Sequence, residues 1–414
     1  MRIVIAGAGI AGCVAGMLLA EQGHEVRAFE AVPQLSPLGV GINLLPHAVS
    51  VLDRLRLAER LEGLGIATRE LVYYNRRGQR IWGEPRGRFA GYPVPQVSIH
   101  RGVLQMTLFE ELKARIGEDR IHTGHKLVAA ADGPPAVATF ERLDGTTTTV
   151  EADLLIAADG IHSALRRQRY PDEGLPRYGG RILWRAVTRA RPFLSGATMI
   201  MAGYQDVKFV AYPLDLPGAD GLQTINWIAE LTHAQMPDRE NWNKEGAKDD
   251  FAGPFASWDF GWLDVPGLIE GAERVFEFPL VDRDPLPRWS FGATTLLGDA
   301  AHPMYPIGSN GASQAILDAD ALSRALAEHR DPLAALAAYE AKRLPATAKI
   351  VLANRGNGPE QCMQIAEERA PQGFARIEDV FAAGELEGIA AKYKAVAGFS
   401  REAVEARTEK VTPA

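Results

Sequence analysis

The chain has 414 residues, of which 46% are hydrophobic and 23% charged, and its formal net charge is −7. This length exceeds a single hydrophobic core of about 250–300 residues, and the composition is that of a globular protein rather than a disordered one. No run of basic residues occurs, which argues against a nucleic-acid partner. Two cysteines, Cys13 and Cys362, are too few for a disulfide framework or a zinc site, so we expect a cytoplasmic protein without a bound metal.

The first 30 residues have the pattern of a strand, a glycine turn, a helix and a second strand. MRIVIA is a short apolar run, GIAGCVAGMLLAEQG has helical length and periodicity, and EVRAFE is strand-like. Such a βαβ unit implies a parallel sheet. The same stretch has the low charge of a signal peptide or a membrane span, but its glycines and the strand that follows favour the βαβ interpretation. We therefore expect no stable membrane association.

Further along the chain, residues 46–64 and 101–116 have the periodicity of amphipathic helices, with the hairpin-like stretch YYNRRGQRIWGEP between them. VATFERLDGTTTTVEA is predicted as two strands across an Asp-Gly turn, and the buried strand DLLIAA follows it. From about residue 176 to 280, short β-type runs separated by turn residues predict a mostly antiparallel sheet. The α/β pattern returns at TTLLGDAA, and helical segments fill the C-terminus.

These elements predict an α/β protein in which a Rossmann-like dinucleotide-binding domain is split around an inserted, mostly antiparallel β-sheet domain and is followed by a helical C-terminus. The expected boundaries are 1–70, 98–175 and 281–355 for the dinucleotide-binding domain, 71–97 and 176–280 for the inserted domain, and 356–414 for the C-terminal helical segment.

Three motifs carry the chemistry, and the first is Gly7-x-Gly9-x-x-Gly12 between the first strand and its helix. Glycines at these positions allow a tight turn, a close approach of the backbone to a pyrophosphate and close helix–strand packing. Glu30 ends the second strand, where an acid accepts hydrogen bonds from an adenosine ribose. A surface glutamate at a strand end is the alternative, but the order of strand, turn, helix and acid favours dinucleotide binding.

The second motif is Asp159-Gly160, which follows the apolar strand LLIAA and leads to Ser163 and Arg166. By its residues alone it is equally well a common Asp-Gly turn, with Ser163 as a helix cap.

The third motif begins at Gly298-Asp299, where an apolar strand ends in an acid placed to accept hydrogen bonds from a sugar or a ribityl chain. A loop containing Pro306 and Gly308 follows, and a helix starts near Asn310. The positive end of that helix dipole would stabilise a ring that gains negative charge on reduction. An ordinary strand–loop–helix capped by Asn310 is the alternative, but it leaves Asp299 and the flat loop, which carries few side chains, unexplained.

In this order and spacing, the three motifs resemble those of the class A FAD-dependent aromatic monooxygenases, the para-hydroxybenzoate and salicylate hydroxylase family. The resemblance covers roughly residues 1 to 355 and implies a Rossmann-like FAD-binding domain. Five stretches, 37–43, 98–106, 282–289, 298–318 and 352–355, resemble the phenazine-modifying branch of this family. The FAD-binding residues that the resemblance implies are Gly7, Gly9, Ala11, Gly12, Glu30, Gly41, Arg101, Asp159, Gly160, Arg166, Gly298, Asp299, Gly308, Asn310, Gly311 and Ala312.

The resemblance further implies that NADH or NADPH reduces the FAD, that O₂ adds to give a flavin C4a-hydroperoxide, and that this species hydroxylates an aromatic or N-heteroaromatic small molecule, phenazine-like, phenolic or carboxylate-bearing. Pro306, His302 and Tyr305 would then lie at the flavin's reactive edge as catalytic candidates, although His302 in a loop equally well satisfies backbone groups. We expect a monomer or a homodimer.

Substrate contacts are expected from the inserted sheet, through Trp184, Arg185, Tyr212 and Trp227. Core packing is the alternative for the aromatic residues, and a surface position is the alternative for Arg185. Two other functions stay open: an FAD-dependent reductase or dehydrogenase of the same fold without oxygenation, and a non-enzymatic dinucleotide-binding or scaffold protein.

Overall fold

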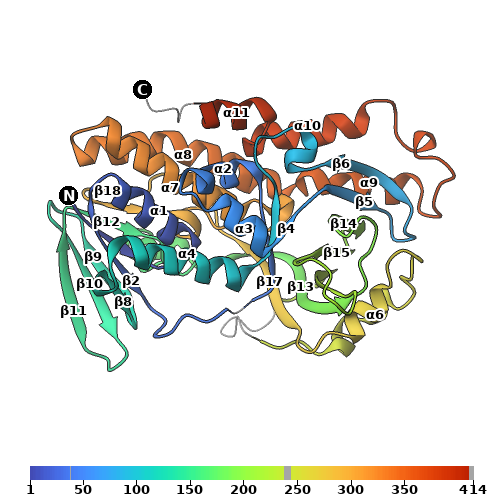
Figure 1. Ribbon diagram of the computed structural model, residues 1–414, viewed down its shortest axis with the longest axis horizontal. Helices are drawn as coiled ribbons and strands as arrows, with labels where there is room; N and C mark the ends of the chain where they lie inside the picture. The colour runs from blue at the N-terminus through green and yellow to red at the C-terminus, as the bar shows by residue number, and fades with distance from the viewer. Residues whose placement is uncertain (38, 237–243, 410–414) are drawn as a thin grey trace.

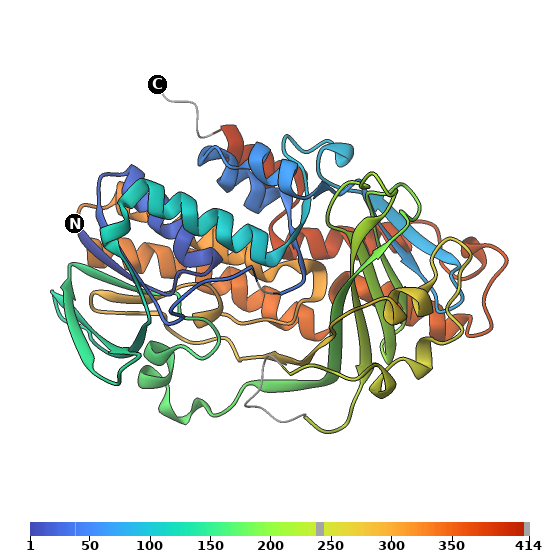
Figure 2. The same ribbon diagram turned by 60° about the horizontal axis from the view of Figure 1, so that its bottom comes forward.

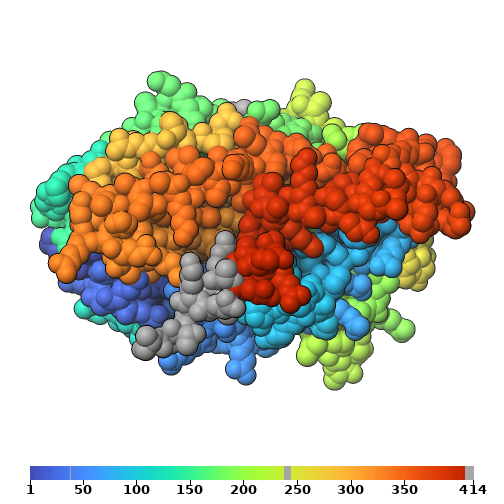
Figure 3. Space-filling view, turned by 90° about the horizontal axis from the view of Figure 1, so that it is seen from above, coloured from blue at the N-terminus to red at the C-terminus, as the bar shows by residue number. Residues whose placement is uncertain are grey.

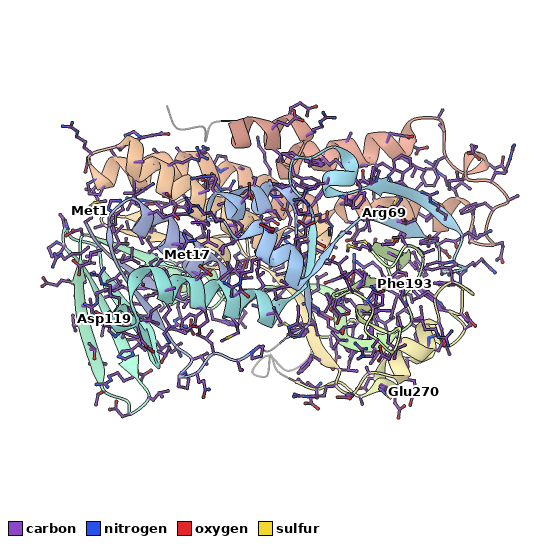
Figure 4. The ribbon with its side chains drawn as sticks, in the orientation of Figure 1. Met1, Met17, Arg69, Asp119, Phe193 and Glu270 are labelled. Carbon is purple, nitrogen blue, oxygen red and sulfur yellow. The ribbon has the colours of Figure 1, made fainter. Side chains whose placement is uncertain are left out.

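The computed structural model describes residues 1–37, 39–236 and 244–409. A parallel sheet with its helices occupies one end of the long axis, and a second sheet occupies the other (Figure 1). Each end has its own hydrophobic core, to which the buried side chains of Met17 and Phe193 belong respectively (Figure 4). The predicted α/β class with an inserted sheet and a helical C-terminus is confirmed.

The first sheet has six strands in the order β18 (Ser290–Phe291), β19 (Thr294–Leu296), β12 (Leu154–Ala157), β1 (Arg2–Ala6), β2 (Glu25–Glu30) and β8 (Ile121–Thr123). All neighbours are parallel except β18 and β19. The carboxyl ends of parallel strands meet at one edge. Because β19, β12, β1 and β2 are neighbours, the three motifs and Glu30 are brought to the same edge from distant parts of the chain.

Helices cover this sheet. The helix α1 (Ile10–Glu21) packs between α4 (Arg101–Ile116) and α7 (Gly311–Glu328), and α8 (Pro332–Arg355) packs on α7 (Figure 2). Residues 46–64 form two helices, α2 (Pro46–Arg54) and α3 (Ala58–Leu64), because Arg56 between them adopts a φ of 61°. A left-handed residue interrupts the helical hydrogen-bond ladder.

The second sheet has seven strands in the order β17 (Phe276–Asp282), β13 (Arg177–Ala190), β16 (Gln223–Thr232), β15 (Val207–Pro213), β14 (Thr198–Gly203), β5 (Glu70–Tyr74) and β6 (Arg80–Pro85). Only β14 and β5 are parallel. The predicted hairpin supplies β5 and β6 as its edge. One face of the sheet packs on an aromatic core that includes α6 (Val265–Glu270).

The remaining strands form two small sheets. The predicted Asp-Gly hairpin forms β10 (Ala136–Arg142) and β11 (Thr147–Ala152), and β10 also pairs with β9 (His125–Ala131). The strands β3 (Gly41–Leu44), β7 (Val97–His100) and β4 (Ile66–Ala67) connect the two halves. The short helix α5 (Ala164–Arg169) follows the second motif.

The C-terminal segment forms α9 (Gln361–Arg369), α10 (Glu385–Ala397) and α11 (Arg401–Glu409), and it runs across one face of the molecule (Figure 3). There α9 packs on β5, β6 and β14, α10 packs on α8, and α11 packs on α2. The segment therefore contacts both halves. Across the part of the chain that the structure describes, no helix combines the length and the apolar character that a membrane crossing requires.

Candidate cofactor and substrate site

A cavity of about 390 Å³ lies between the edge that carries the three motifs and one face of the seven-stranded sheet. We call it the central cavity. Its size and its lining from both halves are those of a ligand site. Twelve of the predicted site residues line it: Gly9, Ala11, Gly41, Arg101, Gly160, Arg185, Tyr212, Asp299, Pro306, Asn310, Gly311 and Ala312.

Two glycines of the fingerprint, Gly7 and Gly12, pack closely against neighbouring backbone, whereas the third, Gly9, has free space beside it. A Cβ atom on Gly12 would lie 1.9 Å from the carbonyl oxygen of Gly7, and one on Gly7 would lie 2.3 Å from that of Ala158. Gly7 also has a φ of +102°, in the region that favours glycine. A Cβ on Gly9, by contrast, would meet nothing within 4 Å. The backbone at Gly9 is therefore free to approach a phosphate group at the start of α1, whose N-cap makes no side-chain hydrogen bond.

Glu30 holds the turn beside this fingerprint. Its Oε2 accepts a hydrogen bond from the backbone N of Ala8 at 2.8 Å, and its Oε1 accepts one from Val32 at 2.9 Å. Glu30 does not line the central cavity itself. Its half-buried carboxylate lies at the end of β2, at the same sheet edge as the fingerprint. An acid that accepts hydrogen bonds from ribose hydroxyl groups is expected at this position.

Asp299 lies deep in the molecule, yet its side chain is open to the central cavity rather than packed against protein. Burial raises the pKa of its carboxyl, while nearby His302 and Arg101 act in the opposite direction. The preceding Gly298 has a φ of +65°, and a Cβ there would lie 3.1 Å from Ala11 and 3.2 Å from Ala315. The strand end thus packs closely on α1 and α7 and leaves the acid facing the cavity.

The glycine-rich loop after Asp299 leads into the amino end of α7, at Asn310 and Gly311, which faces the central cavity. An 18-residue helix carries about half a positive charge at this end, and its N-cap makes no side-chain hydrogen bond. Pro306 lines the cavity beside it. A planar ring that accepts electrons would be stabilised against this surface.

The loop is held from outside by Tyr393 on α10. Its hydroxyl lies 3.1 Å from the carbonyl oxygen of Ile307 and 2.9 Å from Oδ1 of Asn354. A Cβ on Gly308 would lie 2.3 Å from the same hydroxyl. Gly308, predicted to contact the cofactor, therefore faces Tyr393 and not the central cavity.

We expect Tyr393→Phe to weaken FAD binding about three- to fivefold, since one neutral hydrogen bond to the loop is worth about 1 kcal/mol. The dissociation constant for FAD added to the apoprotein measures this. Tyr178→Phe is the control, because the Tyr178 hydroxyl donates to the carbonyl of His233, which is not part of the loop. Equal affinity of the Tyr393 variant and the unmodified protein would contradict the role.

Two of the predicted catalytic residues do not face the central cavity. The imidazole of His302 is buried, its Nε2 bonds to Asp318, and the ring packs on Trp289. Tyr305 is buried between Leu280 and Gly179, in a neighbouring recess on the far side of the loop. Neither side chain therefore lies at the central cavity, where the predicted catalytic contact would require it.

The second motif places only Gly160 at the central cavity. Asp159 accepts a hydrogen bond from the backbone N of Ala164 at 2.8 Å, and Ser163 caps α5, as its side chain accepts one from the backbone N of Arg166 at 3.2 Å. Arg166 is buried, and its guanidinium donates to Glu173 and to the carbonyls of Ala300, Ala301 and Asp284. It braces the Asp299 loop from behind and does not line the central cavity, where its predicted contact with the cofactor would require it.

Two predicted substrate contacts, Trp184 and Trp227, lie on the wrong face of the seven-stranded sheet. Both are buried in the aromatic core, where each packs against Phe251. Successive side chains on a strand point to opposite faces, so Trp184 and its neighbour Arg185 cannot share one. Arg185 lines the central cavity, and the prediction for the two tryptophans is wrong.

Arg185 and Tyr212 form a polar corner of the central cavity. The guanidinium donates to the carbonyl of Gly41 at 3.0 Å and to the Tyr212 hydroxyl, and its buried Nε has no partner. No carboxylate among the described residues pairs with it. Burial lowers the pKa of Arg185 and raises that of Tyr212 to about 12. Such a cation is prepared for an anionic ligand.

Several lining residues have no counterpart among the predictions: Leu183, Met199, Met201, Lys208, Val210, Ile228, Glu230, Asn43, Gln105 and Glu360. Strand alternation from Arg185 and Tyr212 would have found Leu183, Val210 and Lys208, which lie two or four residues away along the same strands. No local signal marks Glu360, which belongs to the C-terminal segment. Among the described residues there is no cluster of side chains suited to a metal ion.

The central cavity combines accessible backbone at Gly9 and Gly160, the carboxylate of Asp299, and the amino ends of α1 and α7. Together with the adjoining substrate sheet, these features define a dinucleotide-binding oxidoreductase fold. The chain belongs to the family described as FAD binding domain, whose model matches residues 1–177 and 281–354. It is an FAD-dependent enzyme of the aromatic monooxygenase class, for which NAD(P)H is the typical electron donor.

Individual relatives agree with this class. The chain is 46% identical over 364 residues to phenazine 1,6-dicarboxylic acid hydroxylase PhzS of Lysobacter antibioticus, covering 85% of this chain and 89% of that protein. It is 31% identical to 6-hydroxynicotinate 3-monooxygenase of Pseudomonas fluorescens, covering 84% and 89%. The fold is similar to that of a salicylate hydroxylase in a substrate complex, with a TM-score of 0.72, 22% identity, and coverage of 100% and 98%.

Proposed function

We propose that the protein hydroxylates a flat N-heteroaromatic carboxylic acid of the phenazine class and that the central cavity holds the flavin ring and this substrate together. The observation that carries the proposal is Arg185, a cation on the cavity wall with a buried, unpaired Nε and no carboxylate partner among the described residues. A substrate carboxylate would complete its hydrogen bonds. The relative with 46% identity is named for hydroxylation of phenazine 1,6-dicarboxylic acid, which supports the choice of a phenazine ring that bears a carboxylate.

The wall beside Arg185 suits a planar ring. Ile228 and Val210 are the cross-strand neighbours that continue its row, followed by Met201, and Met199 lies close by on β14. These side chains are apolar, and the two methionines are flexible enough to fit a flat surface. An apolar wall also excludes water from a reactive oxygenating species.

The cofactor side would be formed by the three motifs. Gly9 and the amino end of α1 would hold the pyrophosphate, Asp299 would accept hydrogen bonds from the ribityl chain, and the amino end of α7 would face the ring. Bound FAD supplies the oxygen activation, with NADH or NADPH as the source of electrons. In this proposal residues 71–97 and 176–280 shape the substrate side, and residues 356–414 close it.

We expect Arg185→Met to weaken the binding of phenazine-1-carboxylate about tenfold or more while FAD stays bound, since a hydrogen bond between two charged groups is worth about 1.5–3 kcal/mol. Calorimetric titration of the oxidised holoenzyme measures the dissociation constant. Arg189→Met on the same strand is the matched control, because Arg189 is exposed and pairs with Asp220. Unchanged affinity in the Arg185 variant would contradict the assignment.

Product analysis decides between this function and the FAD-dependent reductase without oxygenation. The proposed function predicts that phenazine-1-carboxylate stimulates NADH or NADPH oxidation and that a hydroxylated product accounts for the O₂ consumed. Oxidation that yields only hydrogen peroxide with every aromatic acid tested would favour the reductase. A purified protein without flavin colour would overturn both.

A further inference from the structure

The cavity face of the seven-stranded sheet is arranged in rows. Cross-strand pairing places Leu183, Glu230 and Lys208 in the first row, Arg185, Ile228, Val210 and Met201 in the second, and Asn226 and Tyr212 in the third. Rows two residues apart on a strand are separated by about 7 Å. The first row is therefore about 13 Å from the third and about 7 Å from the row of Arg185. A tricyclic aromatic ligand can extend from Arg185 and Tyr212 across the apolar side chains of Ile228 and Val210 to the first row.

The first row carries a buried ionic cluster. The Nζ atom of Lys208 lies 2.8 Å from Oε2 of Glu230 and 2.6 Å from Oε2 of Glu360, and Nη1 of Arg181 lies 2.8 Å from Oε1 of Glu230. All four side chains are buried. Burial alone lowers the pKa of Lys208, but the two glutamates outweigh it and hold that pKa above its usual value. The cluster therefore contains two cations and two anions in balance.

Glu360 differs from the other members of the cluster because it belongs to the C-terminal segment and because only one of its carboxylate oxygens is hydrogen-bonded in the part of the chain that the structure describes. Its Oε2 binds Lys208, whereas no hydrogen bond within the described residues reaches its Oε1. The residue lines the central cavity, as do Glu230 and Lys208. A carboxylate oxygen can only accept hydrogen bonds, and covering it with a ligand that offers no donor costs free energy.

We propose that Glu360 is a specificity-determining residue. Its Oε1 accepts a hydrogen bond from an amino, hydroxyl or ring N–H group at the end of the substrate remote from the carboxylate that Arg185 binds, and it rejects a second carboxylate there. This inference rests on the proposed function, and it gives the substrate a direction: acid toward Arg185 and Tyr212, donor toward Glu360. The cluster is neutral as a whole, so a second acid would meet Glu360 without a free cation to offset it.

Three probes that differ in one substituent test this: phenazine-1-carboxylate, 6-aminophenazine-1-carboxylate and phenazine-1,6-dicarboxylate, each titrated calorimetrically into the oxidised holoenzyme. We expect 6-aminophenazine-1-carboxylate to bind about tenfold more tightly than phenazine-1-carboxylate. We expect the dicarboxylate to bind about tenfold more weakly than phenazine-1-carboxylate. In Glu360→Gln both ratios should shrink to about two- to threefold, with the dicarboxylate gaining most. Glu277→Gln is the matched control, because Glu277 is a buried, Lys244-paired glutamate of the same sheet opposite Trp184.

The results of these titrations distinguish a failure of the role of Glu360 from a failure of the proposed function. Equal weakening of all three acids in Glu360→Gln would show a purely structural role and overturn the inference, while leaving the proposed function intact. A wild-type protein that binds none of the three acids would overturn both. If Glu360→Gln does not retain FAD, Glu360→Asp keeps the charge balance and withdraws the oxygen, so unchanged ratios in that variant would overturn the inference as well.

Discussion

Asp299→Ala should purify with little or no flavin, and FAD added to its apoprotein should bind about ten- to a hundredfold more weakly than to the unmodified protein. The carboxylate of Asp299 is open to the central cavity and follows β19 at the edge where the three motifs meet. Removing it would leave the ribityl hydroxyls without a charged acceptor, and a hydrogen bond to a charged group is worth about 1.5–3 kcal/mol. The ratio of flavin to protein absorbance and the FAD dissociation constant measure the loss.

Two controls make this result specific. Asp299→Asn keeps an acceptor oxygen of nearly the same size, so we expect it to retain part of the flavin. Asp144→Ala removes an exposed acid that only orders its own hairpin turn through Thr146. Full FAD occupancy in Asp299→Ala would mean that the cofactor does not lie against the third motif.

The second large effect is expected on stability, from Asp318 on α7. Its Oδ1 accepts a hydrogen bond from Nε of Arg343 at 2.6 Å, and its Oδ2 bonds to His302 and to the backbone N of Gly298. The group is fully buried directly beneath the Asp299 loop. Asp318→Asn would leave Arg343 buried without its anion, which typically costs about 3–5 kcal/mol in the free energy of unfolding.

This loss should depend on pH in a defined direction. Burial raises the pKa of Asp318, but His302 and Arg343 outweigh burial and hold it below the ordinary value. A carboxyl whose pKa is lower in the folded state contributes stability above its unfolded pKa of about 3.9 and loses it as the pH falls further. The difference between the two proteins should therefore be constant near neutrality and decrease below about pH 4.

Urea denaturation at several pH values measures the difference. Asp320→Asn on the same helix is the control, and a smaller loss is expected, because its partners Arg54 and Arg324 keep about a quarter of their side chains exposed. An Asp318 variant that is no less stable than the Asp320 variant would contradict this account.

The architecture and the edge of the sheet that carries the three motifs can be predicted from local sequence patterns. The local patterns are the βαβ unit, the glycine spacing and the two further motifs at strand ends. They can be recognised in the sequence because turns and helix starts need particular residues at fixed spacings. Gly9, Gly160 and Asp299 were found in this way, as were the helix at 101–116 and the inserted sheet.

Which side chains face the central cavity depends on the three-dimensional packing of the chain. A shift of one residue reverses the face of every strand side chain, so Trp184 and Trp227 were as plausible as Arg185 until the register was known. His302 turns inward because the buried Asp318 of α7 satisfies it, and Arg166 turns inward because the carbonyls of Ala300 and Ala301, together with the nearby Glu173, accept its hydrogen bonds. Glu360 reaches the cavity only because the C-terminal segment packs across both halves. Long-range packing sets each of these positions, and no short stretch of sequence encodes it.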